Sequence, residues 1–153
     1  MPVGADGSIS VLTSNSTHLV VDLMGWITGP TTPAARDGLS VPLTPSRLRQ
    51  PQRRRHPPSL GTRTISVTGA AVPAGASAVS MNLTSDAAVG AGYLTVYPAD
   101  RGLPLISNLN YPARDPRANA GMVRLSSGGA LNTLVNQTTH VIIDVNGYFT
   151  GPT

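Results

Sequence analysis

Two histidine–aspartate pairs are the first residues of this sequence that could do chemistry. His18 precedes Asp22 by four positions, and His140 precedes Asp144 by the same spacing. A histidine beside a carboxylate can act as a general base. Four residues along a β-strand span roughly 13 Å, so neither pair can form a dyad within one strand. A dyad across strands stays open, but the simpler interpretation is that each histidine begins a strand and each aspartate accepts backbone hydrogen bonds at a strand end.

Arginine and tyrosine side chains supply the candidate ligand-binding residues. Arginines cluster at positions 47, 49, 53, 54 and 55, and we expect Arg53, Arg54 and Arg55 to contact an anionic cell-wall polymer or glycan, unless they form a solvated loop. No aromatic side chain lies in this tract to stack on bases, so we expect no nucleic-acid binding. Tyr93 and Tyr97 share the strand face opposite Leu94 and Val96, which predicts two exposed rings for sugar stacking or, alternatively, rings that cover a sheet edge.

Residue types that are missing exclude several kinds of chemistry. The chain has 153 residues, and it contains no lysine, no glutamate and no cysteine. A Walker A loop, an HExxH metalloprotease site and a cysteine nucleophile are therefore excluded, and no G-x-S-x-G motif occurs. With three histidines and no cysteine, we expect no metal and no cofactor. Because no nucleophile and base can be placed together, we expect no enzymatic activity. No apolar run reaches the roughly 20 residues of a membrane helix, so we expect no membrane insertion.

Composition and residue alternation predict an all-β protein. Threonine, serine, valine and asparagine take the place of the common helix formers, and 16 glycines and 14 prolines punctuate the chain. Apolar and polar residues alternate with period two in segment after segment, which predicts about ten strands in an antiparallel, sandwich-like domain with no significant helix. Asn82-Leu83-Thr84, Asn108-Leu109-Asn110 and Asp144-Val145-Asn146 leave open a threefold β-prism or β-trefoil-like fold.

An internal duplication predicts how the chain is organised. Residues 7–30 align without a gap on residues 129–152 at an offset of 122, with nine of 24 positions identical. We interpret residues 1–30 as the closing β-hairpin of a preceding repeat, residues 31–38 as a linker and residues 39–153 as one complete β unit. The extra hairpin is expected to pack against this unit or to pair with a neighbouring unit by strand addition.

An ordered series of motifs resembles a known family. SVPLTPSRL (40–48), GTRTISVTG (61–69), VPAGASAVSMNLT (72–84), GYLTVYPA (92–99), SNLNY (107–111) and THVIIDVNGYF (139–149) are similar to the tandem extracellular repeat of actinobacterial secreted and surface proteins. The resemblance implies a non-catalytic all-β module of an exported protein. Residues 49–60 depart from the family's pattern, as a local reading-frame slip in the gene would produce.

Two functions follow as expectations. The first is a structural or adhesive repeat, extracellular or on the cell surface, that assembles with neighbouring copies through strand or hairpin pairing. The second is a carbohydrate-binding module attached to an exported hydrolase.

Overall fold

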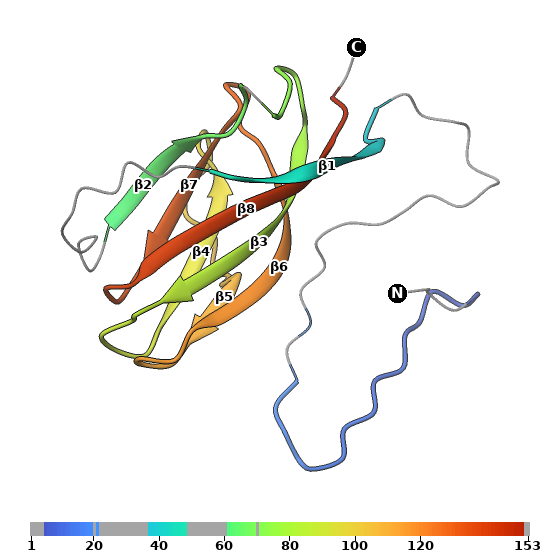
Figure 1. Cartoon of the computed structure of the whole chain (residues 1–153). Helices are drawn as coiled ribbons and strands as arrows, with labels where there is room; N and C mark the ends of the chain where they lie inside the picture. The colour runs from blue at the N-terminus through green and yellow to red at the C-terminus, as the bar shows by residue number, and fades with distance from the viewer. Residues whose placement is uncertain (1–4, 20, 22–36, 49–60, 70, 152–153) are drawn as a thin grey trace.

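Eight β-strands make up the regular structure of the residues that the structure describes (Figure 1). The computed structural model describes residues 5–19, 21, 37–48, 61–69 and 71–151, and these residues contain no helix. The strands are β1 (Ser40–Arg47), β2 (Gly61–Ser66), β3 (Ala78–Asp86), β4 (Gly92–Pro98), β5 (Leu109–Tyr111), β6 (Arg117–Arg124), β7 (Ala130–Val135) and β8 (His140–Phe149). The predicted all-β class is confirmed.

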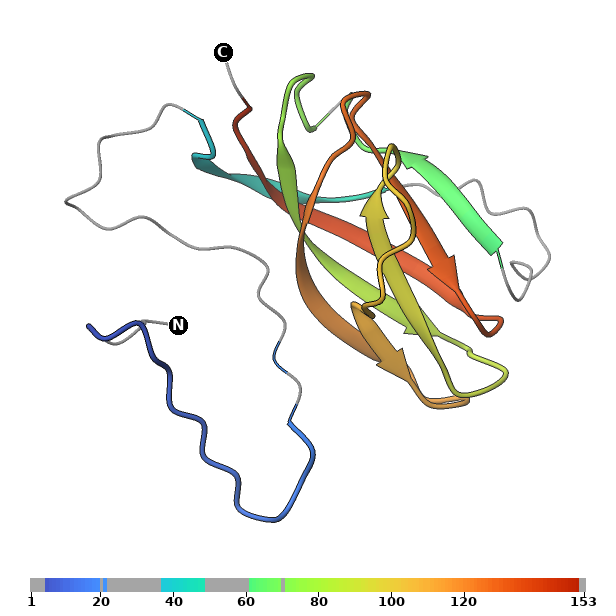
Figure 2. The same ribbon diagram turned by 180° about the vertical axis from the view of Figure 1, so that it is seen from behind.

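The strands form two antiparallel sheets of four strands each, whose layers face one another in Figures 1 and 2. Sheet A has the order β1-β8-β3-β6, and sheet B has the order β2-β7-β4-β5. Alternate side chains point inward, as Val79, Met81 and Leu83 do on β3. Both sheets contribute to one hydrophobic core, which includes Ile65, Leu94 and Leu131 from sheet B and Leu83, Ile143 and Val145 from sheet A. The layering is sandwich-like.

The predicted number of about ten strands is wrong, because the described residues form eight. Leu105 lies outside any strand, and only Leu109–Tyr111 of this stretch pairs with β4. The segment before β5 instead covers the outer face of β4: the Thr95 hydroxyl donates to the Ile106 carbonyl at 2.8 Å, and the Asn108 side chain accepts from the Val96 amide at 2.6 Å. Side-chain hydrogen bonds therefore replace a strand ladder here.

The three Asn/Asp motifs do not mark a threefold repeat. Asn82 lies on β3 and Asp144 on β8, where they are opposite one another in sheet A, whereas Leu109 begins β5 at the edge of sheet B. Two motifs are thus neighbours in one layer, and the third lies in the other layer. The two-sheet arrangement leaves no threefold axis that relates them.

The final two strands do not form the hairpin expected for residues 129–152. β7 pairs with β2 and β4 in sheet B, whereas β8 pairs with β1 and β3 in sheet A. The connection between them is held away from hairpin geometry, because the Tyr111 hydroxyl donates to the Gln137 carbonyl at 2.8 Å and the Val89 amide donates to the Thr138 carbonyl at 3.0 Å. We call residues 130–149 the β7–β8 arch, since they cross from one sheet to the other.

The amino-terminal segment forms no strand over residues 5–19 and 21. Its larger apolar side chains, Ile9, Val11, Leu12, Leu19 and Val21, are exposed, and the segment lies apart from both sheets in Figures 1 and 2. Residues 22–30 fall outside the described part of the chain. The assignment of residues 1–30 to a preceding repeat stays a prediction, and two strands without a sheet to join have little stability of their own.

Candidate binding surfaces

Tyr93 and Tyr97 were expected to present two neighbouring exposed rings, and only one of them does. Tyr93 is 37% exposed, and its backbone amide donates to the Asn136 side-chain oxygen at 2.6 Å. Tyr97 is only 6% exposed, so the expectation that its ring is exposed is wrong. Its hydroxyl lies 3.4 Å from the Thr62 hydroxyl, across β7, so the ring covers the outer face of sheet B. The aromatic candidate site reduces to Tyr93.

The arginine cluster is divided between described and undescribed residues. Arg53, Arg54 and Arg55 lie outside the described part of the chain, so their predicted contacts stay a prediction. Arg47, the first member of the cluster, is at the end of β1 and binds Asp144 on β8 through two hydrogen bonds, Nε to Oδ1 at 2.7 Å and a terminal nitrogen to Oδ2 at 3.0 Å. Arg47 and Asp144 therefore form a bidentate ion pair.

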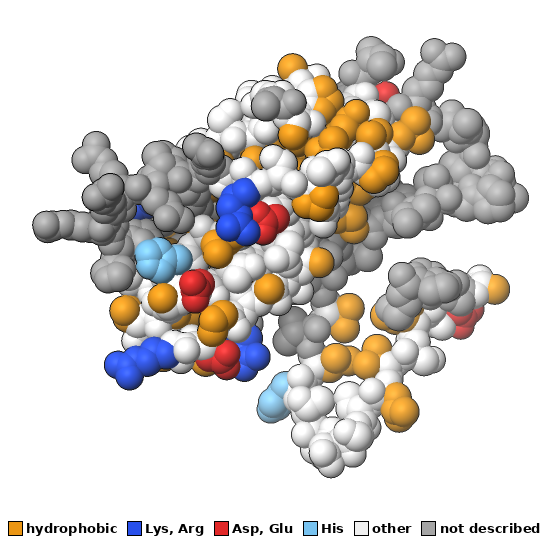
Figure 3. Space-filling model, in the orientation of Figure 1, with side chains coloured by type: hydrophobic (Ala, Val, Ile, Leu, Met, Phe, Trp, Pro, Cys, Tyr) orange, Lys and Arg blue, Asp and Glu red, His pale blue; other side chains and the backbone are white. Residues whose placement is uncertain are grey.

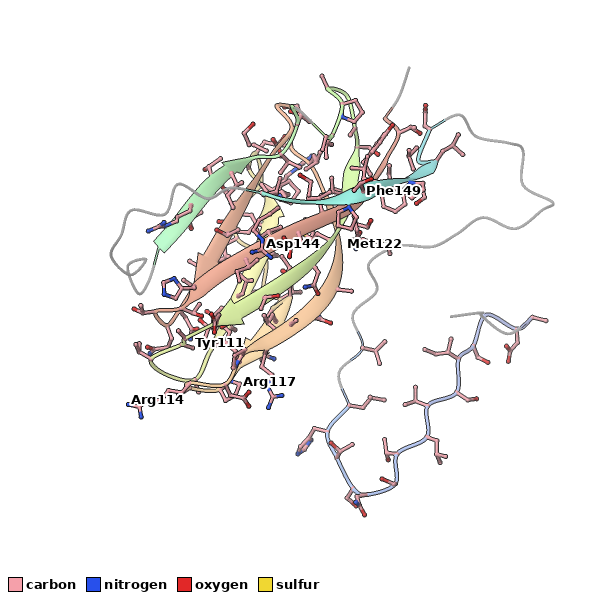
Figure 4. The ribbon with its side chains drawn as sticks, in the orientation of Figure 1. Tyr111, Arg114, Arg117, Met122, Asp144 and Phe149 are labelled. Carbon is pink, nitrogen blue, oxygen red and sulfur yellow. The ribbon has the colours of Figure 1, made fainter. Side chains whose placement is uncertain are left out.

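The Arg47–Asp144 ion pair lies in the middle of the outer face of sheet A. Figure 4 shows Asp144 on this face of β8, and Figure 3 shows one basic and one acidic side chain there among uncharged atoms. The hydrogen bonds and charge of Arg47 lower the pKa of Asp144 below its ordinary value of 3.8, although partial desolvation opposes this. Asp144 was expected to accept backbone hydrogen bonds at a strand end, but it accepts hydrogen bonds from the Arg47 side chain instead. Both carboxylate oxygens are engaged with Arg47, so a role as the orienting acid of a histidine dyad is disfavoured.

Polar side chains extend this face beside the ion pair. The Ser80 hydroxyl donates to the Asn146 side-chain oxygen at 2.7 Å, and the Asn82 amide donates to the Thr84 hydroxyl at 3.2 Å. The strand register shifts between Ser80 and its neighbour, so Asn146 forms a bulge in β8. Polar side chains of β3 and β8 on the outer face of sheet A therefore bind one another.

An open hollow was not predicted by sequence reasoning. It has a volume of about 720 Å³ and lies among the segments that follow β2, β4 and β6, with Asp100, Arg101 and Arg124 in its lining. The Ser127 amide donates to Asp100 at 3.0 Å, which joins two of these segments and lowers the pKa of Asp100. Arg101 pairs with Asp100 at 3.9 Å in this lining. The sequence showed only turn residues in each segment, without indicating that they meet.

Metal-binding clusters and membrane-spanning helices are both absent from the described part of the chain. No group of three histidine or acidic side chains is placed there to hold a metal ion. The same residues include no helix with the length and apolar character needed to cross a membrane.

The chain matches no protein-family model, no curated protein and no solved structure.

Proposed function

We propose that this protein is a non-catalytic structural or adhesive repeat of an exported or cell-surface protein, which joins neighbouring copies into an array. The observation that carries the proposal is the position of the two chain ends of the domain. The Gly38 amide donates to the Thr150 carbonyl at 2.8 Å, the Leu39 amide donates to the Thr150 hydroxyl at 2.9 Å, and the Thr150 amide donates to the Leu39 carbonyl at 3.0 Å. The domain therefore begins and ends at one place.

This arrangement suits display along a tandem array. Each repeat would be attached to the array at the paired ends of β1 and β8, and the rest of its surface would stay exposed to solvent. The duplication supports the same organisation, because residues 7–30 carry a second copy of the last two strands ahead of this unit. Twelve residues, 28–39, separate Ile27, the counterpart of the last residue of β8, from β1. A connection of this length is long enough to link two repeats.

Force on such an array would act on adjacent antiparallel strands. A pull through the two ends of the domain separates β1 from β8 one residue pair after another, starting at Ser40 and Phe149. A pull applied between Ser40 and His140 would instead load all the hydrogen bonds of this strand pair together. In single-molecule stretching, we expect a pull through the two domain ends to separate β1 from β8 at a lower force than a pull between Ser40 and His140. Such a low force suits a repeat that holds its neighbours at a distance and does not carry mechanical load.

The edge strands provide a route for association between copies. β1 carries Pro42 and Pro45, which lack the amide donor needed by an added strand. β6 is an edge strand of eight residues without proline. Among the described edges it offers the longest uninterrupted backbone for strand addition by a neighbouring repeat.

A carbohydrate-binding module is the second candidate, supported by the exposed ring of Tyr93. A pull-down of the full chain on cell-wall preparations and insoluble polysaccharides separates the two functions. The structural repeat predicts no retention that depends on Tyr93, whereas the binding module predicts retention that Tyr93→Ala abolishes. Tyr97→Ala is unsuitable for this test, because truncating a buried aromatic ring costs about 3–5 kcal/mol of stability.

Surface location has its own test. Protease treatment of intact producing cells should remove the protein, while a cytoplasmic marker protein in the same cells stays intact. Protection of the protein under these conditions would contradict the proposal.

A further inference from the structure

The β7–β8 arch is the element that completes both sheets. In the described structure β1 pairs only with β8, and β2 pairs only with β7. Without the arch, the pairs β3–β6 and β4–β5 persist, but the first two strands have no sheet to join. The domain therefore needs a segment that fits between β1 and β3 on one side and between β2 and β4 on the other. We call this place the arch position.

The amino-terminal copy carries side chains that fit this position. The inward residues of the arch, Leu131, Thr133, Val135, Val141, Ile143 and Val145, correspond to Ile9, Val11, Thr13, Leu19, Val21 and Leu23. Summed over these six positions, the side chains of the copy contain one methylene group more than those of the arch. Exchanges that conserve core volume to this degree are well tolerated.

Glycines that the arch position requires recur in the copy. A Cβ on Gly147 would lie 2.7 Å from the Ser80 hydroxyl and 3.1 Å from the Val41 carbonyl oxygen, and the copy has Gly25 there. Just beyond the arch, a Cβ on Gly151 would collide with the Gly75 carbonyl oxygen, and the segment that follows the copy has Gly29 there.

Polar residues with partners outside the arch recur as well. Thr139 binds Ser85 and Asp86, and the copy has Thr17 at that position. Asp144, which binds Arg47, corresponds to Asp22. Identity between the two copies is thus found at positions where the arch contacts the rest of the domain.

The chain can connect the copy to β1 without leaving the domain. Phe149 is paired with Ser40 in the register of β8 and β1, so Ile27 would lie opposite Ser40 in the same place. Paired residues are about 5 Å apart, and the twelve residues from 28 to 39 exceed that span several-fold. The resulting domain would be a circular permutant, a rearrangement that proteins commonly tolerate.

We propose that residues 8–27 can occupy the arch position of their own domain in place of β7–β8, so that the chain holds two alternative closing arches for one set of six strands. β7–β8 is the better occupant. The Asn136 side chain accepts a hydrogen bond from the Tyr93 amide at 2.6 Å, whereas the copy has the shorter Ser14, and it has Thr13 in place of the buried Val135. This inference does not depend on the proposed function.

Substitutions in the full-length chain test the proposal. Ile143 is 1% exposed, and an aspartate there would bury a charge without a partner. We expect the Ile143→Asp variant to keep its β-type circular dichroism and a cooperative melt, because the copy replaces the damaged arch. Val21→Asp alone, the matched control, should leave the melt unchanged. The variant with both substitutions should lose its cooperative transition.

Trp26, the single tryptophan, lies in the copy and reports which arch is used. In Ile143→Asp its fluorescence should change in the same transition as the circular dichroism, and light scattering after gel filtration should give a monomer.

Three outcomes would overturn the proposal. Ile143→Asp could unfold as completely as the double variant, the double variant could stay folded, or Ile143→Asp could form a dimer by exchanging arches between chains.

Discussion

Two buried threonines of the β7–β8 arch should respond oppositely to the same substitution, threonine to valine. Thr139 is 1% exposed, and its hydroxyl donates to the Asp86 carbonyl at 3.0 Å while lying 2.6 Å from the hydroxyl of Ser85. Ser85 is fully buried, and the described residues give it no other hydrogen-bond partner. The Thr139 hydroxyl also lies 3.3 Å from the His140 carbonyl oxygen, and because this carbonyl and that of Asp86 can only accept, we assign Ser85 as the donor to Thr139. Thr139→Val therefore leaves the buried Ser85 hydroxyl without its acceptor and removes the donor to the Asp86 carbonyl.

Thr133 is buried as well but is poorly bonded. Its hydroxyl lies 3.4 Å from the Arg63 carbonyl oxygen, which is well beyond the common O–H···O distance of about 2.8 Å. Valine has nearly the same shape and removes the cost of burying a hydroxyl. The amino-terminal copy of the arch has Val11 at this position and Thr17 at the position of Thr139.

The expected magnitudes follow from these contacts. An unsatisfied buried hydrogen-bonding group costs about 1–3 kcal/mol, so Thr139→Val should lower the free energy of unfolding by that amount. For a domain of this size, roughly 4 °C of melting temperature corresponds to each kcal/mol. Thr133→Val should leave stability unchanged or raise it by up to about 1 kcal/mol.

Urea and thermal unfolding followed by circular dichroism measure both effects. The double variant Ser85→Ala, Thr139→Val should lose less stability than the sum of its single variants, because it removes both partners together. The reasoning would be refuted if Thr133→Val destabilised the protein as much as Thr139→Val, or if the two changes at Ser85 and Thr139 were additive.

Two further predictions concern sheet A. Gly147→Ala should lower the melting temperature, because its Cβ would lie 2.7 Å from the Ser80 hydroxyl, whereas Gly121→Ala, with its nearest contact at 3.7 Å, should have a much smaller effect; equal losses in thermal melts would contradict this. Since Arg47 lowers the pKa of Asp144 in the folded protein, the ion pair should contribute stability above the ordinary pKa of 3.8 and lose that contribution as the pH falls through the lower folded value. Asp144→Asn should flatten this part of the pH profile in urea unfolding, and a profile as steep as that of the parent protein would show that other carboxyl groups cause it.

Alternation of residue types indicated the strands correctly wherever one sheet face is buried. β3, with Val79, Met81 and Leu83 inward, is the clearest example, because period two in sequence is the geometry of a strand. The same rule failed around Leu105 and Tyr97. There the segment before β5 covers the outer face of β4, and no local pattern shows that a distant loop will bury a strand's solvent side.

Some features of the candidate sites could be predicted from the sequence, and others could not. Tyr93 could be predicted as exposed from its place opposite Leu94, and the structure agrees. The ion pair between Arg47 and Asp144 could not be predicted from the sequence, because 97 residues separate the two and only the β1–β8 register brings them together. The hollow beside Asp100 depends on the meeting of separate turns, so its residues carried no signal of their own.

The amino-acid sequence by itself determined that the chain is built of strands and that the sequence of its last two strands is duplicated, because strand periodicity and duplication are properties of residue order. Only the tertiary structure decided that β7 and β8 separate into different sheets, since the choice of pairing partner depends on contacts with β1, β2, β3 and β4. Those contacts bury the inward faces of both strands, and neighbouring residues in the chain cannot supply that burial.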